Sequence, residues 1–185
     1  CPPEVKFFRD FYDDYLRAPD RHARFFATVK AIGLDEDELL SIFGSAYVRS
    51  RELAARKLGK QRWADKNPEN VLYLEQWSRI LDARFCFIDI VRHPLDVLAS
   101  VVEARFDNTL PADLPGKIEA FARYARAGLD FASRHPGRAL VVKYESLVER
   151  PQQTMIDVMA FIGERFEPGM IEGAFAGARQ RGLED

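Results

Sequence analysis

A cation and a hydroxyl stand eight residues apart behind an apolar run, a pattern suited to binding an anion. Arg92 directly follows the near-continuous apolar run 84–91, and Ser100 lies two turns into the helix that Pro94 opens. In open α/β sheets, ligands bind beyond the carboxyl ends of the strands, where a helix start also presents free N–H groups and a positive dipole end. A guanidinium, a helix start and a hydroxyl together predict a phosphate site. The alternative interpretation is a surface ion pair between Arg92 and Asp96.

Two strands and the helices between them must position these residues. The run 84–91 is typical of a strand buried on both faces, and a second apolar run, 139–143, follows a helix expected near 117–134. Strand, helix, strand predicts a parallel sheet flanked by helices, in a helix-rich α/β fold. Two strands are few for such a fold, so we expect it to be incomplete here.

The part of the chain before residue 84 is expected to be helical. The spacing of Phe7, Phe8, Phe11, Tyr12 and Tyr15 predicts an amphipathic helix over 5–17, whose aromatic stripe serves as core or as a wall of a pocket. Further helices are expected from a cap at Asp20 to Gly33, over 35–43, over 45–58, and from Pro68 onward, with an extended segment at 62–66.

Composition bounds the class of protein. The chain has 185 residues, 47% hydrophobic and 30% charged, which suits one globular domain and excludes a disordered or fibrous chain. No stretch approaches the length of a membrane span, and a net charge of −2 gives no general attraction to nucleic acid. The three histidines and two cysteines lack metal-site spacing, so no metal is expected. With 20 Arg against 7 Lys and no export signal, we expect a cytoplasmic protein.

Three separated segments resemble the sulfotransferases that use 3′-phosphoadenosine 5′-phosphosulfate (PAPS). The segment 92–100 is similar to the motif by which that family binds the 3′-phosphate, an Arg after a strand and a Ser eight residues later. The segment 63–68 resembles the W-x-D/E-K-x-P stretch of bacterial and tyrosylprotein-type members, and 143–151 resembles the family's R-Y-E-x-L-V-x-x-P segment. The resemblance implies a P-loop-NTPase-like sulfotransferase fold. It also implies one partial domain over 1–185, with a helical acceptor-side region at 7–60 and a nucleotide-binding core at 62–163.

The resemblance assigns a role to each matching residue. Arg92 and Ser100 would hold the 3′-phosphate of PAPS, and Tyr144 would lie near the nucleotide. Outside the matching motifs, the position of Arg105 one turn beyond Ser100 makes it a further candidate for touching the nucleotide, with a solvated surface arginine as the alternative. Lys66 would offset the negative charge that builds on the leaving phosphate during in-line transfer. Without the motif, Lys66 would be interpreted as a solvated loop lysine.

Sulfuryl transfer to an alcohol also needs a base near the acceptor hydroxyl. The segment 1–6 is similar to the C-x-x-E-x-R context of the base in tyrosylprotein-type members, with Lys6 in place of Arg. This makes Glu4 the candidate base, with Asp65 in reserve. Their alternatives are a helix-start carboxylate for Glu4 and a turn or cap role for Asp65.

The glycine-rich loop that binds the 5′-phosphosulfate in that family has no counterpart in this sequence. No glycine-rich turn precedes Gly33. The resemblance therefore implies that the loop belongs to a first strand–loop–helix unit that is absent here, and we expect the chain to bind nucleotide poorly without it. Two alternatives stay open: a non-catalytic binding or interaction module derived from the fold, and a P-loop-type small-molecule kinase, which would need G-x-x-x-x-G-K-[ST]. Acceptors of three kinds stay open as well: a small molecule, a glycan or a peptide.

Overall fold

The computed structural model describes residues 6–104 and 110–173. The chain divides into two compact units, Cys1–Phe85 (unit 1) and Cys86–Asp185 (unit 2). Because the boundary falls just before the first strand, the nucleotide-binding core expected at 62–163 contributes residues to both units. The division into an acceptor-side region at 7–60 and a nucleotide-binding core at 62–163 stays a prediction.

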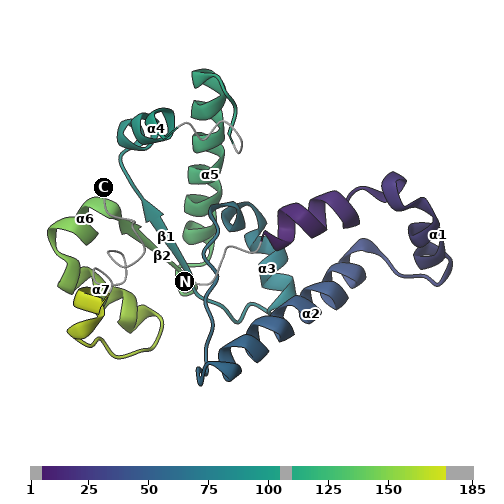
Figure 1. Ribbon diagram of the computed structural model, residues 1–185, viewed down its shortest axis with the longest axis horizontal. Helices are drawn as coiled ribbons and strands as arrows, with labels where there is room; N and C mark the ends of the chain where they lie inside the picture. The colour runs from purple at the N-terminus through teal and green to yellow at the C-terminus, as the bar shows by residue number, and fades with distance from the viewer. Residues whose placement is uncertain (1–5, 105–109, 174–185) are drawn as a thin grey trace. The chain divides into compact units, whose positions relative to one another are not determined.

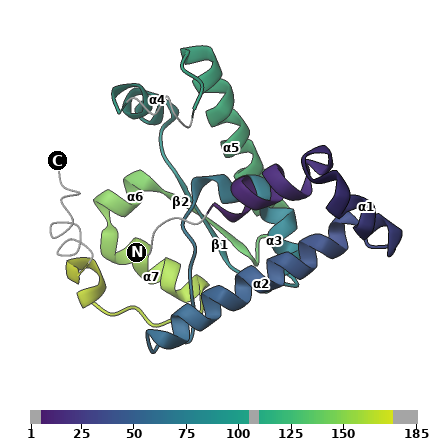
Figure 2. The ribbon, with the colours of Figure 1, turned by 45° about the vertical axis from the view of Figure 1, so that its right-hand side comes forward.

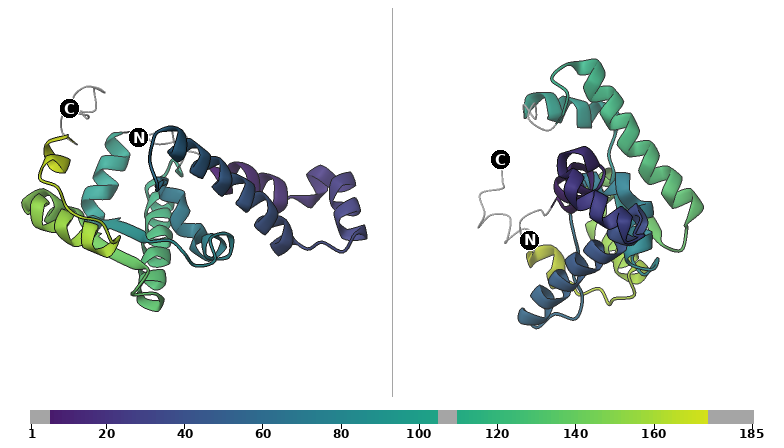
Figure 3. Two further views of the ribbon diagram at one scale, coloured as in Figure 1. Left: turned by 90° about the horizontal axis from the view of Figure 1, so that it is seen from below. Right: turned by 90° about the vertical axis from the view of Figure 1, so that its right-hand side faces the viewer.

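All of the regular secondary structure described in unit 1 is helical. The chain runs out through η1 and α1 and returns along α2, as Figure 3 shows. A stretch without regular secondary structure then leads to two short helices. The elements are the π-helix η1 (Phe8–Leu16), the 3-10 helix η2 (Pro19–His22), α1 (Ala23–Ala31), α2 (Glu36–Lys57), the 3-10 helix η3 (Pro68–Tyr73) and α3 (Leu74–Ile80).

The aromatic stripe of the first helix forms most of the core of unit 1. Phe8, Tyr12 and Leu16 recur every four residues and are almost fully buried, with exposed fractions of 2%, 6% and 4%. The ring of Phe8 stacks on Tyr73 at 4.7 Å and meets the edge of Trp77 at 5.0 Å. The helix expected over 5–17 is therefore confirmed as a helix, although its type is π rather than α.

Two expectations for this unit were wrong. Asp20 does not cap a helix, because it lies inside η2 and α1 begins after His22 without a side-chain cap. The expected break near Gly44 is also missing, since α2 runs unbroken from a capping box at Asp35 and Glu38. Gly44 is buried in this helix because its missing side chain makes room for Ile80 of α3.

Unit 2 is a parallel strand pair flanked by helices. Figures 1 and 2 show β1 and β2 side by side, with α5 on one side of the pair and α6 and α7 on the other. The strands pair in register from Phe87 opposite Ala139 to Val91 opposite Lys143. The elements are β1 (Phe87–Val91), α4 (Pro94–Glu103), α5 (Leu114–Arg134), β2 (Ala139–Lys143), α6 (Tyr144–Glu149) and α7 (Pro151–Phe161).

The helix-rich α/β fold with a parallel sheet is thus confirmed, and β2 has the bounds expected. The first strand differs, because it begins at Phe87 rather than at residue 84 and is not buried on both faces. Ile90 keeps 57% of its surface exposed. The physical reason is that, among the residues described, the sheet has two strands, so few neighbours cover this face.

We predict that Gly44→Ala destabilises unit 1 although alanine favours helices by about 1 kcal/mol over glycine. A Cβ at this position would lie 2.5 Å from Cγ1 of Ile80. Such overpacking costs about 1–3 kcal/mol, so we expect a net loss in the free energy of unfolding, measured by urea titration. Gly137→Ala is the control, because nothing lies within 4 Å of the added Cβ there. A stabilised Gly44→Ala variant would contradict the close approach of α2 and α3.

We predict that Asp89→Asn stabilises unit 2 in a pH-dependent way. Burial in β1 raises the pKa of Asp89 above its ordinary value of 3.8, and its Oδ2 is buried without a hydrogen-bond partner among the residues described. Because the folded pKa lies above the unfolded one, ionisation costs stability as pH rises from about 3.8, and no cost remains below that pH. The Tm gain of Asp89→Asn should therefore vanish at low pH and reach roughly 2–4 °C at pH 7. Glu119→Gln, an exposed carboxylate in α5, is the control, and a gain independent of pH would contradict the explanation.

Candidate functional site

The carboxyl edge of the strand pair brings two of the sequence motifs together. Val91 is aligned with Lys143, so the following residues, Arg92 and Tyr144, leave the sheet at the same edge. The Cζ atom of Arg92 lies 4.9 Å from the centroid of the Tyr144 ring, within the range of a cation–π contact. They line a cavity of about 180 Å³ whose other lining residues are Asp96, Glu145, Val148 and Glu149. Segments 92–100 and 143–151 therefore share one site.

The start of α4 differs from the sequence expectation. It was expected to present free N–H groups, but Pro94 has none and the His93 N–H donates to a carboxylate oxygen of Glu145 at 3.0 Å. The Asp96 N–H turns back to the His93 carbonyl at 3.1 Å. A carboxylate of the protein itself thus occupies the helix start. The hydrogen bond from His93 lowers the pKa of Glu145, and the nearby Arg92 cation adds to the effect.

The other residues predicted for this edge have different outcomes. Among the residues described, no ion pair joins Arg92 to Asp96, although both line the cavity. Ser100 is exposed on α4 and is not one of the lining residues of that cavity. Arg105 lies outside the described residues. The roles of Ser100 and Arg105 remain predictions.

In unit 1, the segment that carries Lys66 is held by side-chain hydrogen bonds on either side of that residue. Asn67 is buried and its side-chain oxygen accepts from the Glu69 N–H at 3.1 Å, which caps η3. The reserve base Asp65 accepts from the Asn70 side-chain amide at 2.9 Å. Lys66 itself lies exposed between these two anchors. The cap role considered for Asp65 therefore falls to Asn67.

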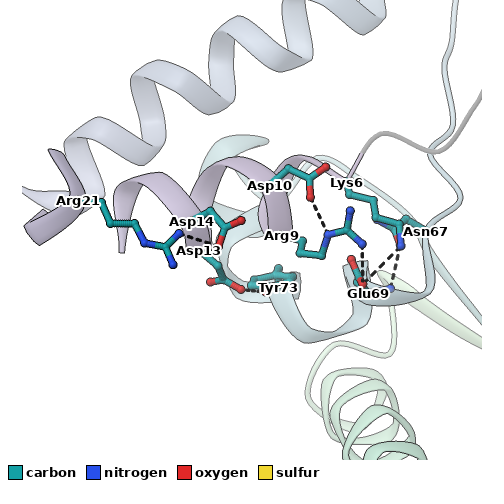
Figure 4. A network of polar contacts seen from close by, with 9 residues as sticks. All are labelled: Lys6, Arg9, Asp10, Asp13, Asp14, Arg21, Asn67, Glu69 and Tyr73. Carbon is teal, nitrogen blue, oxygen red and sulfur yellow. Dashed lines mark hydrogen bonds and ion pairs between the residues drawn. The ribbon is translucent and has the colours of Figure 1, made fainter. Parts of the chain in front are cut away.

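Ion pairs join the N-terminal residues described to the same segment. Lys6 Nζ lies 3.6 Å from Oε1 of Glu69, and Arg9 lies 3.9 Å from the same oxygen, as Figure 4 shows. A hydrogen bond from Tyr73 to Asp13 links η3 to η1 as well. Glu4, the candidate base, lies outside the described residues. Lys6, from the motif that suggested Glu4, is thereby brought beside the segment 63–68.

A second cavity, of about 320 Å³, lies within unit 1 and is mostly aromatic. Its lining residues are Lys6, Phe7, Asp10, Phe11, Phe43 and Tyr47. The first-helix aromatics were expected from the sequence, whereas Phe43 and Tyr47 were not, although the four-residue spacing of these two aromatics in α2 could have indicated them. Glu145 was not expected either, although its place next to Tyr144 after a parallel strand was the available signal.

The part of the chain that the structure describes contains neither a candidate metal cluster nor a candidate membrane span. Within residues 6–104 and 110–173, no group of three or more histidine, cysteine, aspartate or glutamate side chains could hold a metal ion. In the same residues, no helix combines the length and the apolar character that crossing a bilayer requires.

Comparison with known proteins identifies the fold and the family. The solved structure titled "Sulfotransferase Domain from the Curacin Biosynthetic Pathway" superposes with a TM-score of 0.54 at 22% sequence identity, a likeness that concerns the fold alone. The match covers 88% of this chain and 54% of that one, so the chain spans about half the length of the solved domain. No curated protein sequence matches the chain. The model of the sulfotransferase family matches residues 2–168, nearly the whole sequence, and the chain therefore belongs to the sulfotransferase family.

Proposed function

We propose that this protein transfers a sulfuryl group from PAPS to a hydroxyl or amine acceptor by in-line displacement. The observation that carries the proposal is the meeting of Arg92 and Tyr144 at the carboxyl edge of the parallel strands. This edge is where open α/β sheets bind their ligands, and an exposed guanidinium there suits a phosphate. Membership of the sulfotransferase family supports the reaction class.

The residues at this edge fit a nucleotide phosphate through side chains rather than through the helix start. Arg92 supplies a guanidinium that can bind a phosphate with two parallel hydrogen bonds, and Tyr144 offers an aromatic ring beside it. Ser100 and Arg105 are proposed to add a hydroxyl and a second cation. Since Glu145 already accepts the His93 N–H, the positive end of α4 contributes less than the sequence suggested.

In the proposed sulfuryl transfer, PAPS supplies the reacting group and side chains of the protein supply the charge stabilisation and the base. PAPS, when bound, supplies an activated sulfuryl group and a phosphate that can leave. Lys66 is proposed to neutralise the charge that develops on that phosphate, and such electrostatic stabilisation is typically the largest single contribution to catalysis. Glu4 is proposed to take the acceptor proton. Asp65 is the weaker candidate, because its carboxylate already accepts from Asn70.

We predict that Arg92→Ala and Lys66→Ala separate binding from turnover in the whole natural protein. Loss of a charge-assisted contact to phosphate costs about 1.5–3 kcal/mol, so Arg92→Ala should bind adenosine 3′,5′-bisphosphate about 10- to 100-fold more weakly in calorimetry. Lys66→Ala should keep that affinity and lose about 100- to 1,000-fold in the rate of PAPS consumption with an acceptor panel.

The matched controls are Arg123→Ala and Lys60→Ala. Arg123 forms another arginine–tyrosine contact in unit 2, with Cζ 5.7 Å from the ring of Tyr124, and Lys60 is an exposed lysine near Lys66 in the sequence. Neither control should change affinity or turnover. Equal bisphosphate binding by Arg92→Ala and the unmodified protein would overturn the proposed site and favour the non-catalytic module.

We predict that Glu145→Gln and Glu145→Ala act in different ways. Glutamine keeps an oxygen for the His93 N–H and removes one negative charge beside Arg92, so bisphosphate should bind about three- to tenfold more tightly, most clearly at low salt. Alanine also removes the acceptor, so we expect a lower Tm for Glu145→Ala than for Glu145→Gln. Glu119→Gln is the charge-matched control. Weaker bisphosphate binding by Glu145→Gln would show that this carboxylate does not oppose the ligand.

A further inference from the structure

The four-residue spacing along η1 places aromatic and charged side chains in separate rows, and two of these rows line the cavity of unit 1. Positions 8, 12 and 16 form the buried row described above. Phe7 and Phe11 belong to the next row, which is half-buried, and Lys6 and Asp10 belong to a third row. The cavity of about 320 Å³ is lined by these last two rows together with Phe43 and Tyr47 of α2. The aromatic side chains that the core covers only in part therefore line one cavity.

The walls of the cavity are aromatic rings in mutual contact. The ring of Phe7 stacks on Tyr47 with centroids 4.7 Å apart and on Phe11 at 5.6 Å. Phe43 packs against Phe11 at 5.0 Å. Rings held in this way present preformed apolar faces, and a flat ring that enters can stack on them. The volume lies at the lower end of small-molecule sites, so one compact group fits better than an extended chain.

The two charged residues at the cavity each have an opposite partner. Lys6 pairs with Glu69 at 3.6 Å, and Asp10 accepts from Arg9 at 2.6 Å. Because both charges are balanced, the cavity has no excess charge to attract a carboxylate or an ammonium ion. A sugar would have to replace the water around many hydroxyls with few available partners, which is costly. The cavity therefore favours a neutral, mostly apolar ligand.

Two electrostatic interactions link this cavity to the segment that carries Lys66. Glu69, the partner of Lys6, follows Lys66 by three residues. Tyr47 lies close enough to Asp65 for the carboxylate to act on its hydroxyl: burial, and then Asp65, raise the pKa of Tyr47 to about 12. The Tyr47 hydroxyl is buried and has no hydrogen-bond partner among the residues described, so Tyr47 serves the cavity as a neutral ring.

We propose that this cavity binds the ring of the sulfuryl acceptor, and that the acceptor is an uncharged aryl alcohol. The proposal rests on the proposed sulfuryl transfer and names its acceptor class. In the balanced step, the phenolic oxygen forms a bond to sulfur while the bond from sulfur to the bridging phosphate oxygen breaks. The electron pair leaves with adenosine 3′,5′-bisphosphate, and the phenolic proton passes to the base, for which Glu4 is the candidate.

Binding of 4-methylphenol to the unmodified protein, followed by protein-observed NMR without PAPS, tests the site. We expect saturable binding that shifts the signals of Phe7, Phe11, Phe43 and Tyr47. The ionised analogue 4-methylbenzoate and the hydroxyl-rich methyl glucoside should bind at least tenfold more weakly. Tighter binding of the benzoate or the glucoside, or no saturable binding of the phenol, would overturn the acceptor class.

A matched pair of variants locates the binding. Phe43→Trp should fill the cavity and weaken 4-methylphenol binding at least tenfold, whereas Phe25→Trp, at an exposed ring of α1 outside the cavity, should leave it unchanged. Equal binding by both variants would overturn the location. Should Phe43→Trp fail to fold, NOEs between the phenol and the Phe7 and Phe11 rings of the unmodified protein decide the same question. Because no donor is present, failure here leaves the bisphosphate test of the sulfuryl transfer unaffected.

Discussion

The parallel pairing of β1 and β2 determines which side chains meet at the carboxyl edge of unit 2. The register sets Val91 opposite Lys143, and this alignment alone brings Arg92 and Tyr144, more than fifty residues apart in the chain, to one edge. A register shifted by one residue would turn the strand faces over and separate the guanidinium from the ring. The helices α4 and α6 start at the same edge, so the places of Arg92, Ser100 and Tyr144, the described residues of unit 2 proposed to contact the nucleotide, depend on this one pairing.

The edge is more acidic than a phosphate site first suggests. One guanidinium shares its cavity with the carboxylates of Asp96, Glu145 and Glu149. Glu145 has a structural use, because its hydrogen bond to the His93 N–H ties the end of β2 to the end of β1. In the proposed phosphate site, the same carboxylate would oppose an incoming dianion. The edge thus combines an anchor that stabilises the loop with an excess of carboxylates, and Arg92 would have to supply most of the attraction.

Local sequence patterns predicted the elements better than the contacts between them. The strand 139–143 and the helix opened by Pro94 follow from apolar runs and from proline at a helix start, both of which depend on neighbours in sequence. Gly44 was misread because the room it makes serves Ile80, thirty-six residues away. The hydrogen bond from the His93 N–H to Glu145 was missed for the same reason. At the candidate site, the motif around Arg92 indicated the sheet edge. The carboxylates of Glu145 and Glu149, which make that edge acidic, come from α6 after the neighbouring strand β2.

The first helix of the chain shows how one sequence pattern can serve two purposes. Over nine residues, an apolar repeat of about four does not distinguish an α-helix from the wider π-helix, so the sequence predicted only an amphipathic stripe. In the structure, the stripe divides into a buried row at Phe8 and Tyr12 and a half-buried row at Phe7 and Phe11. The first row stabilises unit 1 and the second lines the cavity. Because the two rows share one helix, the packing that holds the core also fixes the walls of the cavity.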